Sequence, residues 1–173
     1  AQAVFAELRN DSAIRQRAGV FYGETIAWLA ELLRFMGRGA QALAAVEEAL
    51  RVADETVLQE AGNLGALRSR ALLRNRRAQA ALDVYDYATA EKMARSVVED
   101  WTEFIRFDAD NDTARNNRRV AAGMVAEACW RQGRLDTAIE LTRANVRESI
   151  ERGGSPSSVR GSGFQIQRVD YLE

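Results

Sequence analysis

Small and hydrophobic residues recur along the chain at a spacing of 48 residues. The same type of residue returns in each period at several places: Ala30, Ala78 and Ala126; Ala42, Ala90 and Ala138; Leu50, Val98 and Val146. Gly37 and Gly133 also lie two periods apart, with Tyr85 midway between them. Recurrence at a fixed period of this size is typical of a repeat protein.

Each period predicts a helical hairpin, because alanine allows two helices to cross closely and glycine supplies the left-handed conformation that ends a helix. Capping residues predict three first helices: from Asp11-Ser12 to about Met36, from Asn63 to about Val84, and from Asp112-Thr113 to about Gln132. The second helices are expected at about 40–57, 87–106 and 135–152. A single hairpin cannot bury its apolar face alone, so the hairpins are expected to stack.

The fold class expected from this pattern is all-α, with about three repeats over residues 1–152. Residues 153–173 are expected to be a linker and tail, since Gly153 to Ser158 is rich in Gly, Ser and Pro. Residues 1–10 align with the latter half of a second helix. We therefore expect the chain to begin inside a repeat, as a fragment of a larger protein.

The composition excludes several kinds of catalytic and metal sites and argues against several classes of protein. The chain has no histidine and a single cysteine, Cys129, which excludes a Ser/His/Asp triad, a Cys/His dyad and an HExxH zinc site. The 24 Lys and Arg nearly balance the 25 Asp and Glu, which argues against a nucleic-acid or anionic-membrane binder. No apolar run approaches the roughly 20 residues of a membrane span. We expect a cytoplasmic protein that is not an enzyme and has no cofactor or metal.

The repeated residues resemble the tetratricopeptide repeat family, whose pattern has small residues and glycine around the hairpin turn. The positions that carry the resemblance are Ala30, Gly37, Gly39, Ala42, Val46 and Ala49; Ala78, Tyr87, Ala90, Ala94 and Val97; Ala126, Gly133, Leu135, Ala138, Thr142 and Asn145. The best local match is GRLDTAIELTRANV. The period exceeds the family's roughly 34 residues, as in long-period bacterial repeats of this type, so both helices must be longer. Thr142 and Asn145 also depart from the usual apolar or small residues.

The resemblance implies a right-handed superhelix of stacked antiparallel hairpins, in which the first helices line a concave groove. The residues that the family pattern places in this partner groove are Glu31, Arg34, Asn75, Gln79, Glu127 and Trp130. Asn75 and Gln79 could bond a peptide backbone, and Arg34 could meet a carboxylate. The alternative is a face that is simply solvated.

The function favoured by these features is a protein-protein interaction scaffold, as a module of a larger bacterial signalling or regulatory protein. The partner would be a protein or peptide bound in the groove. A first alternative is self-association, as a homodimer formed through exposed repeat ends. A weaker alternative is a small-molecule sensor or an enzyme that uses carboxylates alone.

Three further features have a structural interpretation beside a functional one. The basic cluster of residues 68–77 could bind an acidic partner, but pairing with acids such as Asp83, Asp86, Glu91 and Asp110 is favoured. Cys129 is expected to be a buried, inert thiol rather than a nucleophile. Asp108, Asp110 and Asp112 alternate as in a calcium loop but lack its glycine and closing glutamate, so helix capping is favoured.

Overall fold

The computed structural model describes residues 12–60 and 62–151, with side chains from residue 18 onward. The helices in these ranges are α2 (Ser12–Phe35), α3 (Gly39–Gln59), α4 (Leu64–Asp83), α5 (Tyr87–Phe107), α6 (Asp112–Arg131) and α7 (Leu135–Glu151). The described residues form no strand. The expected all-α class is therefore confirmed, and the predicted helix boundaries agree within a few residues.

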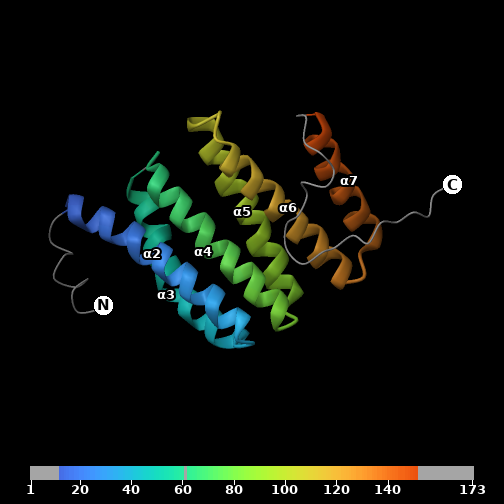
Figure 1. Ribbon diagram of the computed structural model, residues 1–173, viewed down its shortest axis with the longest axis horizontal. Coiled ribbons are helices and arrows are strands. Elements are labelled where there is room, and N and C mark those ends of the chain that lie inside the picture. Colours follow the sequence, from blue (N-terminus) through green and yellow to red (C-terminus); the bar gives the residue numbers. More distant parts are fainter. Residues whose placement is uncertain (1–11, 61, 152–173) are drawn as a thin grey trace.

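The helices are arranged as consecutive hairpins (Figure 1). Each helix packs on the next along the chain, and α4 also packs on both α2 and α6. The helices α2, α4 and α6 run side by side in one direction on the near side of the molecule, with α3 and α5 behind them (Figure 1). The first helices of the hairpins therefore share one face.

The turn inside each hairpin is built in the same way three times. The residue with a positive φ is Gly37 (71°), Tyr85 (64°) or Gly133 (78°). The amide of the next residue donates, over 2.8–3.0 Å, to a carbonyl in the last turn of the preceding helix: that of Leu33, Ala81 or Cys129. This is the Schellman arrangement, which satisfies carbonyls at the end of a helix. As a result α3, α5 and α7 begin 48 residues apart.

The turns between hairpins also repeat. Asn63 caps α4 by accepting from the Ala66 amide at 3.0 Å, and Asn111 caps α6 by accepting from Ala114 at 2.8 Å. The predicted cap at Asn63 is confirmed, whereas the one at Asp112-Thr113 is wrong. Asp112 is already helical and its carboxylate binds Arg115, while Asn111 has the extended backbone that a cap needs. The cap predicted at Asp11-Ser12 lies outside the described side chains.

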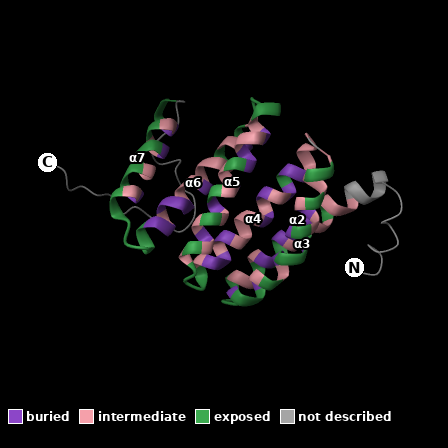
Figure 2. Cartoon of the chain, turned by 180° about the vertical axis from the view of Figure 1, so that it is seen from behind, coloured by how far each residue is buried: buried purple, intermediate pink, exposed green. Residues whose placement is uncertain are grey.

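The core is continuous from hairpin to hairpin. The six alanines of the predicted helix crossings are all buried: Ala30, Ala42, Ala78, Ala90, Ala126 and Ala138. One apolar cluster joins α2, α3 and α4, and a larger one joins α4, α5 and α6. Leu72 packs against both clusters. Buried residues accordingly follow the inner side of every helix (Figure 2).

A buried carboxylate links three helices behind the shared face. Asp100 of α5 accepts from Arg70 at 2.6 Å and from Arg74 at 2.9 Å, and Arg74 also reaches Asp54 of α3 at 2.7 Å. Burial raises the pKa of Asp100, against the opposing effect of Arg74 and Arg70. Burying the charges is costly, and the two arginines compensate for it.

The basic cluster of α4 is thus paired within the chain, as the structural interpretation predicts. The acids that form these pairs come from α2, α3 and α5: Glu24, Glu31, Glu47, Asp54 and Asp100. The four acids suggested from the sequence have other partners, Asp110 binding Arg115 and Asp86 accepting from the Thr89 amide. Asp83 binds Arg34, and Glu91 binds Arg95. The pairing partners depend on helix packing, which the sequence pattern does not reveal.

Candidate functional site

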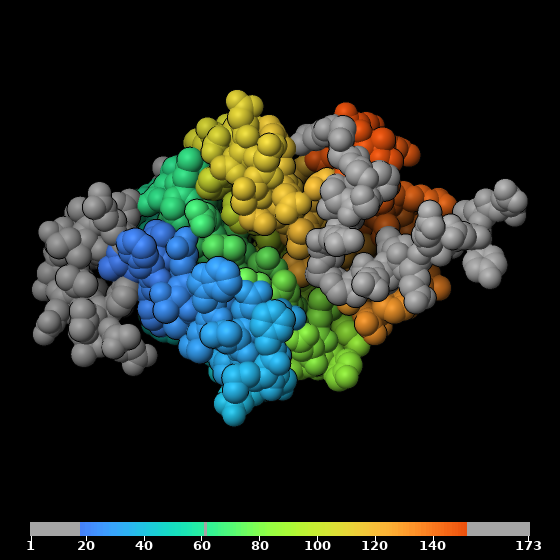
Figure 3. Space-filling view, in the orientation of Figure 1, coloured from blue at the N-terminus to red at the C-terminus, as the bar shows by residue number. Residues whose placement is uncertain are grey.

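The candidate site is the surface that α2, α4 and α6 share, here called the α2–α4–α6 face. It is defined by the polar residues Glu31, Arg34, Asn75, Arg76, Gln79, Asp83 and Glu127 and by two tryptophans, Trp28 and Trp130. In the space-filling view α4 is set back between α2 and α6, so the surface is shallowly hollowed there (Figure 3). The six groove residues predicted from the sequence all belong to these three helices.

A hydrogen-bond network crosses this face from α2 to α4. Arg34 donates to Gln79 Oε1 at 2.7 Å and to the Asp83 carboxylate at 2.6 Å. Arg76 donates to the same Gln79 oxygen at 3.0 Å and to Glu31 at 2.6 Å. The structure therefore brings Glu31, Arg34 and Gln79 together. Their polar groups are bound to the neighbouring helix, so Arg34 is not an unpaired cation awaiting a partner's carboxylate.

Two members of this network, Arg76 and Asp83, were not among the groove residues predicted from the sequence. Both contact α2 residues 45 or 49 positions earlier. A search for opposite charges near one period apart could have found them. Burial lowers the pKa of Arg76, Glu31 opposes that shift and Arg34 adds to it. The Arg76 guanidinium also lies 5.9 Å from the centre of the Trp28 ring, within reach of a cation–π interaction.

The α6 end of the face has a different character. Glu127 is half-buried, and its ion pair with Arg131 is long at 3.7 Å. Burial raises the pKa of Glu127, Arg131 opposes that shift and the carboxylate of Asp83 adds to it. Trp130 is 41% exposed, with Arg131 4.6 Å from its ring centre. This end therefore offers an incompletely neutralised carboxylate beside an accessible aromatic ring.

Asn75 lies on α4 outside the arginine network. Its Oδ1 atom is buried and has no hydrogen-bond partner within the described part of the chain. An unsatisfied buried acceptor costs on the order of 1–3 kcal/mol. Of the six predicted groove residues, the structure thus joins Glu31, Arg34 and Gln79 in one network, to which Asp83 links Glu127 only through its charge.

Cys129 does not belong to this face. It is buried, and its thiol lies 3.7 Å from Glu91 Oε1. Burial raises the pKa of the thiol, and the Glu91 carboxylate raises it further. The thiol is therefore held in its protonated, poorly nucleophilic form, and the prediction that Cys129 is buried is confirmed.

No group of three or more His, Cys, Asp or Glu side chains within residues 12–60 and 62–151 could hold a metal ion. None of the helices α2 to α7 is long and apolar enough to cross a membrane.

Comparisons of the chain with models of protein families, with curated proteins and with solved structures found no match. The resemblance to tetratricopeptide repeats therefore rests on this chain's own residues.

Proposed function

We propose that the chain is a protein-protein interaction scaffold of tetratricopeptide type, in which stacked hairpins form a right-handed superhelix. Three Schellman turns of the same geometry, at Gly37, Tyr85 and Gly133, support a repeating unit of one hairpin. The packing of α4 on both α2 and α6 supports a stack in which the first helices line one surface.

The partner is a peptide or protein segment that lies along the α2–α4–α6 face. The observation that carries this proposal is the α6 end of the face, where exposed Trp130 stands beside half-buried Glu127. Tryptophan is enriched among residues that dominate binding energy. A carboxylate whose pKa is raised by burial and by Asp83 gains from an added cation. The preferred segment thus pairs a basic side chain with an apolar one.

The arginine network prepares this surface for binding. Arg34 and Arg76 are held by hydrogen bonds to the Asp83, Gln79 and Glu31 side chains. Side chains fixed before binding lose little conformational entropy on complex formation, where each free one costs about 0.5–1.5 kcal/mol. The network therefore acts as the floor of the site, and the α6 end provides the specific contacts.

The test is selection of ligands from a random-peptide display library, followed by titration of the enriched peptides. We expect these peptides to carry Lys or Arg near an apolar residue. Trp130→Ala should weaken their binding about tenfold or more, which corresponds to about 1.4 kcal/mol. Glu127→Gln should weaken the binding of the basic peptides and make their affinity less sensitive to salt.

Leu58→Ala is the matched control, because Leu58 is exposed on α3, away from the face. It should leave peptide affinity unchanged. The proposal would be contradicted if the selected peptides had the same affinity for the Trp130→Ala and Glu127→Gln variants as for the unaltered chain. A selection that enriches no peptide would also contradict it.

We extend the proposal to a non-catalytic, cytoplasmic module of a larger bacterial signalling or regulatory protein. The absence of histidine and the buried, protonated Cys129 support a role in binding rather than in nucleophilic catalysis.

A further inference from the structure

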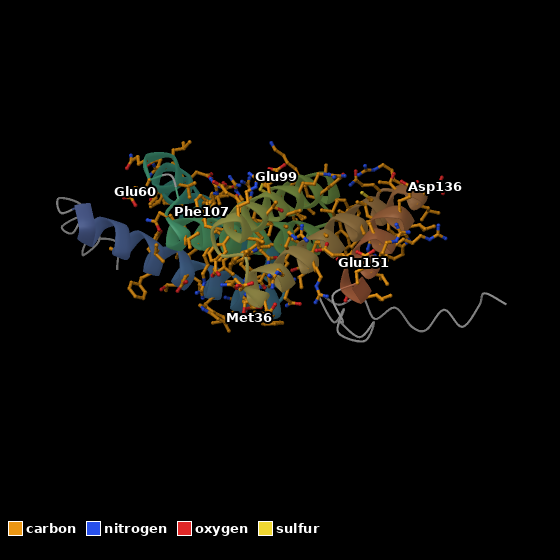
Figure 4. The ribbon with its side chains drawn as sticks, turned by 90° about the horizontal axis from the view of Figure 1, so that it is seen from above. Met36, Glu60, Glu99, Phe107, Asp136 and Glu151 are labelled. Atoms are coloured by element: carbon orange, nitrogen blue, oxygen red, sulfur yellow. The ribbon has the colours of Figure 1, made fainter. Side chains whose placement is uncertain are left out.

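An apolar stripe follows the outer side of α2. It consists of six side chains that are each between 43% and 80% exposed: Phe21, Trp28, Leu29, Leu32, Phe35 and Met36. At 3.6 residues per turn these positions fall within about 120° of the helix circumference. Met36 marks the end of the stripe at the edge of the molecule (Figure 4). Such a contiguous patch on a helix is typical of an interaction surface.

The positions of α4 and α6 that lie one and two periods after the stripe show how the same side of the helix is buried in the later hairpins. One and two periods after Leu32 stand Ala80 and Ala128, both buried. Two periods after Trp28 stands Met124, which is also buried. Ala80 belongs to the apolar cluster that α4 forms with α2 and α3. The middle of the stripe thus corresponds to positions that the later hairpins bury against a preceding hairpin, whereas the equivalents of Phe35, Asp83 and Arg131, are exposed.

We propose that the apolar stripe of α2 binds the same stripe of a second copy of the chain, forming a symmetric homodimer. The stripe is nearly self-complementary when two copies of α2 run antiparallel. Phe21 and Phe35 stand seven residues on either side of Trp28. A twofold axis near Trp28 therefore places Phe21 of one copy opposite Phe35 of the other.

Charges on α2 favour a second copy as the occupant. The charged side chains of α2 that the structure describes flank the stripe, and each is paired with an arginine or aspartate of α4: Glu24 with Arg68, Glu31 with Arg76, and Arg34 with Asp83. Two copies can therefore meet without placing like charges opposite each other, and no acidic or basic partner is selected. An uncharged surface of this kind is typical of the core of homodimer interfaces.

The size of the stripe is also adequate for a dimer. It extends over about 22 Å at 1.5 Å per residue. Its three aromatic side chains alone expose roughly 300–500 Å², since each presents about 150–250 Å² in total. With the three aliphatic side chains and the rim the area approaches the roughly 800 Å² per partner of a standard interface.

Light scattering coupled to size exclusion, over a wide range of loading concentrations, tests this proposal on the full chain. We expect a mass that rises with concentration toward twice 19.2 kDa. Leu32→Glu places a charge on each stripe near the axis and should weaken the dimer at least 100-fold. Its circular dichroism and melting curve, measured at concentrations where the unaltered chain is monomeric, should be unchanged because Leu32 is exposed. Leu58→Glu, at an exposed position of α3, is the matched control and should dimerise normally.

Cysteine cross-linking tests the antiparallel arrangement separately. Leu29→Cys lies beside the proposed axis and should form a disulfide between two identical chains. Phe21→Cys should cross-link to Phe35→Cys when the two variants are mixed, and not to itself. The natural Cys129 is buried and does not compete.

A mass of one chain at every concentration would overturn the proposal. The same result is expected if residues 1–11 or another protein occupy the stripe, and it would overturn the proposal in that case too. A dimer that survives Leu32→Glu would overturn it as well. The two proposed surfaces share Trp28, but they are tested with different residues. Trp130 and Glu127 lie on α6, outside the stripe, so Trp130→Ala and Glu127→Gln should leave the dimer intact. Failure of one proposal can therefore be distinguished from failure of the other.

Discussion

At the scale of single residues, Tyr85 stands where the other two hairpins have glycine. Its φ of 64° is in the left-handed region, like those of Gly37 and Gly133. A side chain in this conformation costs on the order of 1–2 kcal/mol. The Tyr85 ring makes an edge contact with Tyr87, with centroids 6.2 Å apart, which offsets part of this cost. The turn therefore tolerates tyrosine at some expense of stability.

We expect Tyr85→Gly to raise the free energy of unfolding by about 0.5–1 kcal/mol, because relief of the backbone strain exceeds the lost ring contact. Gly37→Ala should lower it by about 1 kcal/mol. A Cβ at Gly37 would meet nothing within 4 Å, so that loss is conformational alone. Urea denaturation of both variants measures the two changes. A destabilised Tyr85→Gly protein would mean that the aromatic pair outweighs the strain.

At the scale of helices, Glu91 connects α5 to the turn between α6 and α7. Its carboxylate accepts from Gln132 at 3.1 Å and from Arg95 at 2.9 Å, and it also binds Arg134. Burial alone would raise the pKa of Glu91, but the hydrogen bonds from Arg134, Arg95 and Gln132 outweigh it and lower the pKa to about 2. The charged form of Glu91 therefore stabilises the contact between neighbouring hairpins.

Because the folded-state pKa of Glu91 lies below its ordinary value of 4.5, its contribution is present above about pH 4.5 and is lost as the pH falls toward 2. Because Arg134 and Arg95 are half-exposed, solvent screens their interaction with Glu91, so we expect its contribution to be roughly 1–2 kcal/mol. The unaltered chain should exceed Glu91→Gln in stability by that amount at pH 6, and the gap should narrow by pH 3.

Urea denaturation at the two pH values measures this gap. Glu99→Gln is the control, since Glu99 is an exposed glutamate of the same helix (Figure 4), and it should change stability little at either pH. A gap between Glu91→Gln and the unaltered chain that stays constant or widens on acidification would refute the role given to Glu91.

At the scale of the whole molecule, the described helices form a row in which contacts are made mainly between neighbours. The central helices α4 and α5 are packed by helices on more than one side, whereas α2 and α7 each have an outer side that no described helix covers. In such a row, stability depends on each unit and its nearest neighbours. The ends are therefore expected to open more readily than the middle.

Hydrogen exchange followed by mass spectrometry checks this expectation. Amides of α4 and α5 should exchange most slowly, and those of α7 faster. Amides of α2 should gain protection as the protein concentration rises, if its apolar stripe forms the proposed dimer. Equal protection in all of the described helices, α2 to α7, would contradict the nearest-neighbour account.

Much of the fold could be predicted because it depends on local rules that repeat. The residue that ends each first helix must accept or tolerate a positive φ, and Asn63 has the side chain that a helix start requires. The buried alanines at Ala42 and Ala90 follow from the same period. The position of the cap at Asn111 was missed by one residue because Asp, Asn and Thr all stand there and all can cap.

Less of the candidate site could be predicted. The family pattern assigned Arg34 and Gln79 to one surface, where they do lie, but did not show that they bind each other and Asp83. The apolar stripe of α2 was missed because an exposed and a buried apolar face look alike in sequence. Leu32 is exposed, whereas its equivalent Ala80 is buried because the hairpin of α2 and α3 packs against it.

The sequence by itself determined the helices, their turns and the period of 48 residues, because capping, left-handed turns and close crossings depend on residues near one another in the chain. The tertiary structure decided which charges are neutralised and which apolar face stays open. Those outcomes depend on side chains 20 or more residues apart that meet when helices pack, as Arg74 and Asp54 or Arg34 and Asp83 do.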